Sequence, residues 1–156
     1  MPVNPIPQGY ETVTPYLCCK DATAALKFYE EAFGATQTML LAMPDGKVGH
    51  AEIRIGNAII MLSDEFPEMG NVSPETLGGH SSSLMIYVKD VDAFVAHAVS
   101  KGALVLKPVA DQFYGDRNAK LKDPSGHVWM FGTHIEDVSP EEMERRVAAF
   151  CKGEES

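Results

Sequence analysis

The sequence predicts an α+β fold that contains two copies of a β-α-β-β-β module, followed by a C-terminal helix. Asp21 and Asp90 each precede an amphipathic helical pattern with apolar residues at i, i+3, i+4, i+7 and i+8, and a Gly-Ala pair ends each pattern. When the two Gly-Ala pairs are aligned, the alternating segment 50–62 falls on segment 118–131. The repeat therefore indicates two similar half-domains that share a core.

The elements follow one another in the same order in both copies. Residues 12–18 and 83–88 have the β-branched and aromatic content of a first strand, and the helix and three further strands come after each of them. We divide the chain into an N-terminal arm (1–11), a first module (12–65), a linker (66–81), a second module (82–135), and a C-terminal helix and tail (136–156).

Three segments lie outside the repeat. The first nine residues contain three prolines, which indicates an extended arm of the kind that packs on a partner chain. The linker is rich in Pro, Gly and Ser and is long enough to be mobile or to cover a cleft. Ser139-Pro140 is a strong helix start, and Glu142 can reach back to close a capping box. This helix has an apolar face that we expect to dock on the core or on a neighbouring subunit: Met143, Val147 and Phe150.

Composition excludes several classes of protein. The chain has 156 residues, 45% of them hydrophobic and 22% charged, which is typical of one soluble globular domain. It has no apolar run near the ~20 residues that span a bilayer and no secretory signal, so we expect a cytoplasmic protein. A net charge of −9 argues against nucleic acid or an anionic membrane as a partner.

The three cysteines indicate a reducing compartment. Cys18, Cys19 and Cys151 form no C-x-x-C pair, and adjacent cysteines rarely bond to each other. Cys18 and Cys19 end an apolar strand, where a thiol usually behaves as a small hydrophobic group. We favour a packing role for them, with a reactive cysteine as the alternative.

The helix string ALKFYEEAFGA and the hairpin string YGDRNAKLKDPSGHVWMF, together with the repeat, resemble the vicinal-oxygen-chelate superfamily. That group contains glyoxalase I, extradiol dioxygenases, fosfomycin-resistance transferases and bleomycin-binding proteins. FYEEAFG, YGDR and the terminal THIEDVSPEEMERR look most like its PhnB-like branch. The resemblance covers about residues 12–146. It implies the glyoxalase/bleomycin-resistance fold, in which each module is a half-barrel with its helix on the convex side and a cleft on the concave side.

The resemblance also implies where a metal would bind. In metal-dependent members, His or Gln on the first strand and Glu on the fourth strand of each module hold the ion. These positions fall on Thr14 and Met61 in the first module and on Ser83 and Met130 in the second. A thioether or a neutral hydroxyl is a poor ligand for such ions, so we expect no metal and no other cofactor.

Strand alternation predicts what lines the cleft instead. If the two methionines point inward, methionine, tyrosine and small hydroxyl side chains share their face. Soft apolar contacts with a few hydrogen bonds suit a hydrophobic or aromatic small molecule. The alternative is that the methionines only fill a core. The residues predicted to bind the ligand here are Thr14, Tyr16, Met61, Ser83, Met85 and Met130.

Two further groups are candidates for chemistry. His50 and Glu52 lie two apart on one strand, so they are neighbours on one face, and the carboxylate can make His50 a general base. The alternative is a polar strand edge. Arg117, beside Tyr114, can bind a carboxylate or phosphate of the ligand, or else pair with Asp116 or another surface carboxylate.

The remaining histidines have simpler interpretations. His80 lies in the linker and His127 in a turn, and we expect both to be solvated. His134 accompanies the exit from the last strand.

We therefore hypothesise a metal-independent small-molecule-binding protein, a homodimer with its cleft at the interface. The alternative is a lyase, dioxygenase or transferase that uses His50 and Glu52 as acid and base, or a metal bound at other positions. A third possibility is an interaction module without a ligand. The sequence leaves open whether the modules pair within a chain or are exchanged between chains.

Overall fold

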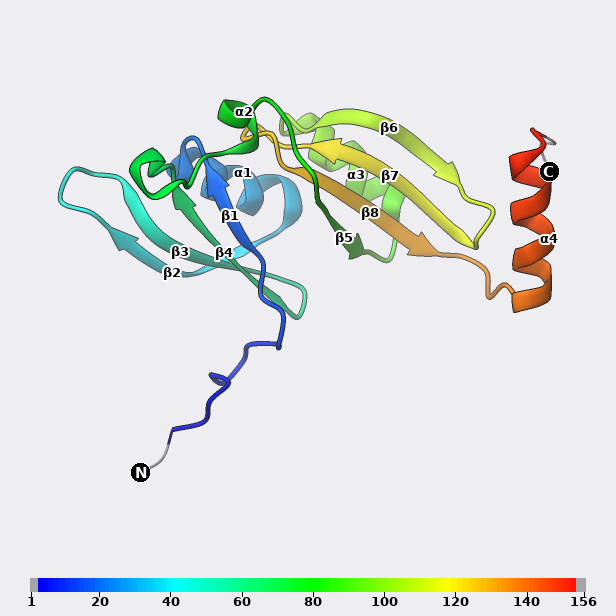
Figure 1. Cartoon of the computed structure of the whole chain (residues 1–156), viewed down its shortest axis with the longest axis horizontal. Helices are drawn as coiled ribbons and strands as arrows, with labels where there is room; N and C mark the ends of the chain where they lie inside the picture. Colours follow the sequence, from blue (N-terminus) through cyan, green and yellow to red (C-terminus); the bar gives the residue numbers. More distant parts are fainter. Residues whose placement is uncertain (1–2, 154–156) are drawn as a thin grey trace.

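The fold was described from a computed structural model, which covers residues 3–153. Met1 and Pro2 of the expected arm and residues 154–156 of the tail lie outside the described residues. Figure 1 shows the elements in chain order. They are β1 (Tyr16–Cys19), α1 (Ala22–Phe33), β2 (Thr36–Ala42), β3 (Val48–Ile55), β4 (Ala58–Asp64), a 3₁₀ turn (Pro67–Met69), α2 (Pro74–Leu77), β5 (Ser83–Tyr87), α3 (Val91–Ser100), β6 (Leu104–Asp111), β7 (Asp116–Lys122), β8 (Val128–His134) and α4 (Pro140–Cys151).

The two predicted β-α-β-β-β modules are confirmed. Each forms a four-stranded mixed sheet, in the order β1-β4-β3-β2 and β5-β8-β7-β6. The pairs β1/β4 and β5/β8, each at one edge of its sheet, are parallel, and all other neighbouring strands are antiparallel. The equivalent pairs Tyr16–Met61 and Met85–Met130 lie opposite each other across the parallel pairs, so the repeat extends to the register.

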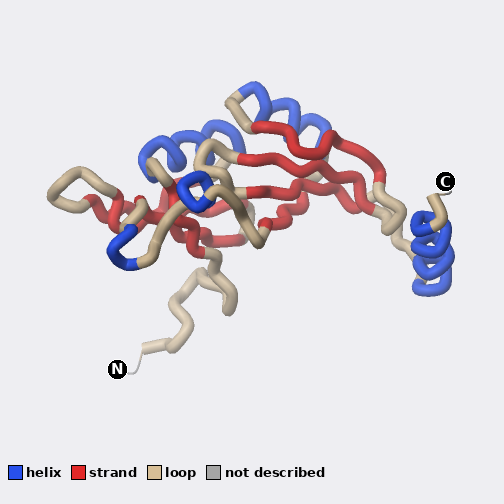
Figure 2. Tube along the Cα trace, turned by 45° about the horizontal axis from the view of Figure 1, so that its top comes forward, coloured by secondary structure: helices blue, strands red, loops and turns tan. Residues whose placement is uncertain are grey.

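The helix signals of the sequence also form as predicted. Asp21 and Asp90 cap α1 and α3, accepting hydrogen bonds from the backbone N–H of Ala24 and Ala93 at 2.9 and 3.0 Å. Gly34 ends α1 in the left-handed conformation, with φ of 67°. Both helices lie on the same side of the two sheets (Figures 1 and 2), so the opposite faces of both sheets are left open.

The modules meet through α1 and α3, around an aromatic cluster. Phe33 of α1 contacts Phe94 of α3 and Trp129 and Phe131 of β8, with ring centroids 4.9–6.1 Å apart. Tyr29 of α1 adds an edge contact to Trp129 at 5.4 Å. Trp129 and Phe131 are fully buried and Phe33 nearly so, and one continuous core extends through both modules.

A buried carboxylate joins the same two parts of the chain. Asp123, in the turn between β7 and β8, accepts hydrogen bonds from the Tyr29 hydroxyl at 2.5 Å and from the Trp129 indole N–H at 2.8 Å. Its other oxygen accepts from the backbone N–H of Ser125 and His127. The sequence predicted a tight turn here, and the structure adds a polar link between the modules.

The first strand is shorter than predicted. β1 begins at Tyr16, and the prediction of strand structure for residues 12–15 is wrong. Pro15 has no N–H to donate, and only its carbonyl takes part, accepting from Met61 N at 2.9 Å. Residues 12–14 continue the N-terminal arm instead.

The C-terminal helix begins as predicted but does not dock on the core. Ser139 caps α4, whereas the Glu142 carboxylate binds Arg145 and Arg146 instead of closing a capping box. α4 projects from the end of the second sheet (Figure 1), and none of its described residues is buried. Arg146 holds it by donating to the Phe113 carbonyl and to Glu136. No helix in residues 3–153 is long and apolar enough to cross a membrane.

Replacement of Phe33 by alanine tests whether the aromatic cluster holds the modules together. We expect Phe33→Ala to lower the free energy of unfolding by about 3–5 kcal/mol, because it leaves a cavity between three elements. Chemical denaturation measures this. Phe150→Ala is the control, since Phe150 is 67% exposed on α4. Equal, small effects of both changes would show that the cluster does not carry the stability of the fold.

Candidate functional site

A hydrogen-bonded chain of four side chains lies on the open face of the first sheet. Glu52 of β3 accepts from the Tyr10 hydroxyl at 2.5 Å and is bonded to His50 Nε2 at 3.1 Å. The Tyr16 hydroxyl lies 3.1 Å from His50 Nδ1. Alternation along β3 produces this grouping as predicted, because Ala51 and Ile53 are fully buried on the helix side.

Glu52 is the electrostatic centre of this chain. It is only 4% exposed. Burial by itself raises its pKa, but the hydrogen bonds from Tyr10 and His50 outweigh burial, and the net pKa of Glu52 is lowered. The same hydrogen bond to Glu52 raises the pKa of Tyr10. Glu52 is therefore ionised at neutral pH and accepts hydrogen bonds from both neighbours.

This pattern assigns the tautomer of His50. An ionised Glu52 accepts hydrogen bonds only, so in the neutral imidazole of His50 the proton is on Nε2, and Nδ1 accepts from the Tyr16 hydroxyl. A ligand that displaces Tyr16 would meet the Nδ1 lone pair. That geometry suits either hydrogen bonding to a ligand O–H or N–H, or removal of its proton.

The N-terminal arm covers part of this face. A hollow of about 400 Å³ lies between the arm and β4. Met61 of β4 lines one side, and the arm lines the other with Pro5, Ile6, Pro7, Tyr10, Glu11, Thr12 and Thr14. Two of the predicted ligand-binding residues thus border a mostly apolar hollow, next to the chain of hydrogen bonds.

The second sheet carries a related cluster on its own open face. Asp116 of β7, 5% exposed, accepts from the Tyr87 hydroxyl at 2.8 Å and is bonded to His134 Nδ1 at 2.8 Å. His134 Nε2 also bonds Asp137 at 2.9 Å, and hydrogen bonds to both carboxylates raise the pKa of His134. His134 thus binds two carboxylates, whereas the sequence predicted only a residue at the end of the last strand.

Methionines lie beside this second cluster. Met85 opposes Met130, and its Cε occupies the space where a side chain on Gly132 would begin. Ser83 opposes Val128 at the start of β5. Tyr114, in the β6–β7 turn, accepts a hydrogen bond from Asn118 at 2.7 Å. Ser83, Met85, Met130 and Tyr114 are therefore all associated with one open face.

Arg117 lies apart from these residues. Its guanidinium donates two hydrogen bonds to Asp92 of α3 and one to Asp111 of β6, each at 2.7 Å. These bonds raise the pKa of Arg117. Arg117 follows Asp116 on the strand and so takes the helix side. Of the two roles considered for it, the structure contains the pairing with surface carboxylates.

The four positions that correspond to metal ligands do not fit a metal. Thr14 lies before β1 and donates to the Glu11 carbonyl at 3.4 Å, while Met61 and Met130 offer thioethers and Ser83 a hydroxyl. Within residues 3–153, no three His, Cys, Asp or Glu side chains are grouped so that they could hold an ion. We therefore derive no chemical step through a metal.

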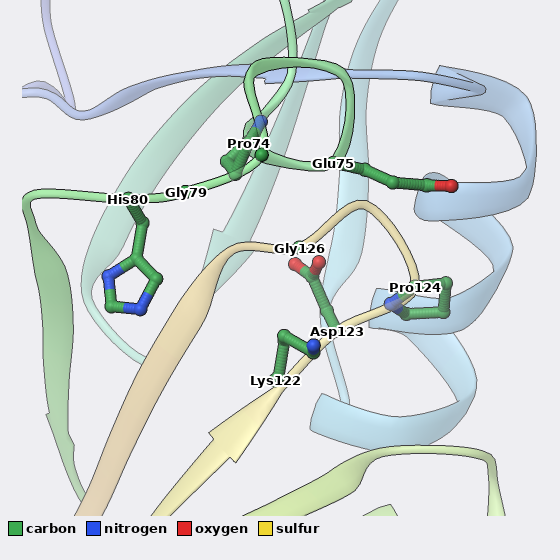
Figure 3. A pocket seen from close by; sticks show the side chains of 9 residues that line it. Pro74, Glu75, Gly79, His80, Lys122, Asp123, Pro124 and Gly126 are labelled. Atoms are coloured by element: carbon green, nitrogen blue, oxygen red, sulfur yellow. The ribbon is translucent and has the colours of Figure 1, made fainter.

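A second hollow, of about 320 Å³, lies between α2 and the β7–β8 turn. Figure 3 shows Glu75 pointing away from it toward the start of α1, and its carboxylate binds Lys20 of the β1–α1 loop at 3.0 Å. Asp123, at its floor, already accepts four hydrogen bonds. His80 and Lys122 are the other charged or titratable side chains that line it, and none of the predicted site residues does.

Two other sequence interpretations are settled by burial and contacts. Burial raises the pKa of Cys18 to about 11 and of Cys19 to about 12, so both thiols stay protonated and behave as packing groups. His127 is not a solvated turn residue, because its Nε2 is bonded to the Cys18 carbonyl at 2.7 Å. This bond adds to the contacts between the modules.

The structure therefore gathers the predicted site residues into two half-sites. Tyr16, His50, Glu52 and Met61 belong to the first, with Thr14 at its edge, and the methionines of β5 and β8 belong to the second. Contacts between the modules run through α1 and α3, so the two half-sites do not face each other within one chain. Sequence reasoning missed Tyr10 and Asp116, whereas strand alternation places Tyr87 on the same face as Ser83 and Met85. For Asp116, strand alternation was an available signal.

A Tyr10→Phe variant tests the link between the arm and Glu52. Loss of the hydroxyl removes a hydrogen bond that lowers the Glu52 pKa, so we expect this pKa to rise, together with faster amide exchange in residues 5–12. Carboxyl carbon NMR titration and hydrogen exchange measure the two effects. Tyr16→Phe is the matched control, because Tyr16 touches His50 but not Glu52. Identical changes in both variants would contradict a direct role of the arm.

Comparison with known proteins agrees with this architecture. An uncharacterized protein of Mycobacterium bovis is 35% identical over 140 residues, which cover 88% of this chain and 92% of the relative. The crystal structure of TioX from Micromonospora sp. ML1 has a TM-score of 0.64 at 24% identity and covers 80% of this chain and 99% of its own. A Pseudomonas aeruginosa protein has a TM-score of 0.66 at 20% identity, covering 81% and 99%.

At these low identities the two crystal structures support the fold alone. The model of one family matches residues 11–131, which span both modules from the arm to β8. The chain belongs to the glyoxalase/bleomycin resistance protein/dioxygenase superfamily.

Proposed function

We propose that this protein binds a hydrophobic or aromatic small molecule without a metal, in a cleft between two copies of the chain. The observation that carries the proposal is the replacement of all four ligand positions by hydroxyl and thioether groups on an otherwise intact scaffold. Within the superfamily, the strings FYEEAFG and YGDR favour the PhnB-like branch.

Exposed apolar side chains support a dimer. On the open faces, Tyr16 is 51% exposed, Leu41 57%, Tyr87 62% and Leu104 53%. Two of these side chains lie on each sheet, and large apolar groups that are exposed on a sheet face favour a binding surface. A two-fold axis would bring the first sheet of one chain opposite the second sheet of its partner, and would form two equal clefts.

Matching positions of the two sheets are complementary for such pairing. Glu52 opposes Met61 on the first sheet, and Lys120 opposes Met130 on the second. Equivalent positions of the two sheets thus carry opposite charges. This favours pairing of the first sheet of one chain with the second sheet of its partner over pairing of two identical sheets. The N-terminal arm and α4 extend beyond their own modules (Figure 1), so both are available to contact a partner chain.

Ligand binding in this cleft would rely on contact area and a few oriented hydrogen bonds. Met61, Met85 and Met130 supply flexible, polarizable surface that adapts to a ring system. His50 Nδ1 and the Tyr16 and Tyr87 hydroxyls supply the polar contacts that fix its orientation.

Dye binding tests this function. We expect N-phenyl-1-naphthylamine, a neutral aromatic fluorophore, to bind saturably with one molecule per cleft, and sedimentation to give a dimer. Met61→Glu should weaken binding by about tenfold or more, because it sets a charge in an apolar cleft. Met69→Glu is the matched control, since Met69 is 79% exposed in the linker. Stoichiometric binding of nickel, zinc or manganese at micromolar affinity would contradict the proposal.

A second candidate function is catalysis with His50 and Glu52 as base and orienting carboxylate. The bond of 3.1 Å between His50 and Glu52 favours it, as does the position of Nδ1, which a ligand that displaces Tyr16 would meet. It would make the protein a lyase, dioxygenase or transferase of the same superfamily.

His50→Ala tests the catalytic alternative. If His50 is the general base, the turnover rate of an α-hydroxycarbonyl or thiol-conjugated substrate should fall at least about 10²-fold in the variant, since general base catalysis contributes that much. Steady-state kinetics measures this, and circular dichroism checks the fold. His134→Ala is the control, because His134 is likewise bonded to a buried carboxylate. An unchanged rate in His50→Ala would remove this function.

A further inference from the structure

Three lysines share the open face of the second sheet. Lys107 of β6 lies directly opposite Lys120 of β7, and Lys122 follows Lys120 by two residues on the same strand face. Like charges directly opposite each other across two strands destabilise a sheet. In residues 3–153, none of the three lysines forms an ion pair with a carboxylate.

Protection of the sheet edge explains only part of this arrangement. β6 is an edge strand, and lysine with proline on an edge discourages pairing with other chains, which accounts for Lys107 and Pro108. β7 lies between β6 and β8, so Lys120 and Lys122 have no such role. Their side chains are half-buried, and neither forms an ion pair with a carboxylate of the described residues.

The charge of the two open faces is opposite to that of the whole chain. Counted on the strands, these faces carry four cations, Arg54 and the three lysines, against the two carboxylates Glu52 and Asp116. Both carboxylates are already bonded to a tyrosine and a histidine. The chain as a whole has a net charge of −9, so the strands of these two faces are more positive than the chain as a whole.

The neighbours of the lysines are apolar. Lys120 lies beside Met130, which opposes Met85, and Lys122 lies between Leu104 and Val128. A cation next to a methionine surface suits a molecule with an aromatic body and an anionic group. Such a group would also relieve the repulsion between Lys107 and Lys120.

We infer that the ligand of the proposed cleft is an aromatic or apolar anion, and that Lys107 and Lys120 bind its carboxylate, sulfonate or phosphate group. This inference rests on the proposed function and specifies its ligand class.

Two dyes that differ by one group separate the proposed function, binding of an aromatic molecule, from the inference that the lysines bind an anionic group on it. 8-Anilinonaphthalene-1-sulfonate is N-phenyl-1-naphthylamine with an added sulfonate. In Lys107→Gln/Lys120→Gln, we expect the affinity for the sulfonate dye to fall by about tenfold or more, as the loss of a charge-assisted hydrogen bond implies, while the neutral dye binds as before. The sulfonate dye should also bind less tightly at high salt in the wild type only.

Lys89→Gln/Lys101→Gln is the matched control, because it removes two exposed lysines that flank α3 and changes the net charge equally. The melting temperature of Lys107→Gln/Lys120→Gln should stay the same or rise, since a like-charge pair is removed. If Lys107→Gln/Lys120→Gln bound the sulfonate dye with unchanged affinity and still bound the neutral dye, the inference about the anionic group would be overturned, and the proposed function would stand. If neither dye bound the wild type, both the proposed function and this inference would be overturned. If the control variant lost as much affinity for the sulfonate dye, the loss would be an effect of net charge, and the inference would be overturned.

Discussion

The aromatic contact between α1 and the second module is the constraint on which the rest of the structure depends. Phe33 packs against Trp129 and Phe131, and Tyr29 reaches the buried Asp123 carboxylate across the same boundary. Because this contact uses the helix sides of both sheets, it fixes the sheets next to each other with their other faces free. A closed cleft inside one chain would need these faces to turn toward each other, which would separate the aromatic rings. The core therefore determines that each chain presents two separate open sheet faces, each with its own group of predicted site residues.

The sequence predicted this fold well wherever a pattern repeats. Capping aspartates, glycine stops and the period of two located the modules, and alternation on β3 separated the buried Ile53 from His50 and Glu52 on the open face. The site was predicted less completely. Tyr10 comes from an arm without periodicity, 42 residues before its partner Glu52, and no local signal marks such a contact. In the YGDR string, the charge of Arg117 drew attention, although alternation assigns it to the helix side.

In each module a buried carboxylate lies between a tyrosine and a histidine. The stability that Glu52 contributes in the first cluster is lost at low pH, whereas the stability that His134 contributes in the second is lost at high pH. The pKa of Glu52 is lowered in the folded chain, so its contribution to stability is present above its ordinary value of 4.5 and is lost as the pH falls through the folded value. The pKa of His134 is raised, so its contribution is complete below 6.5 and is lost as the pH rises through the folded value. Between 4.5 and 6.5 both contributions are present.

Replacement of metal ligands by methionines also changes how large a ligand must be. A coordinated ion can hold a small substrate through one or two strong bonds, whereas contacts with methionine and tyrosine contribute about 0.3 kcal/mol for each non-hydrogen atom of a drug-sized ligand. Micromolar affinity, about 8 kcal/mol, then needs a ligand of roughly 27 such atoms. The hollow beside Met61, about 400 Å³, is near the lower end of the range for ligand pockets. On the proposed function, a ligand of that size would need surface from the second sheet as well, and a partner chain would provide it.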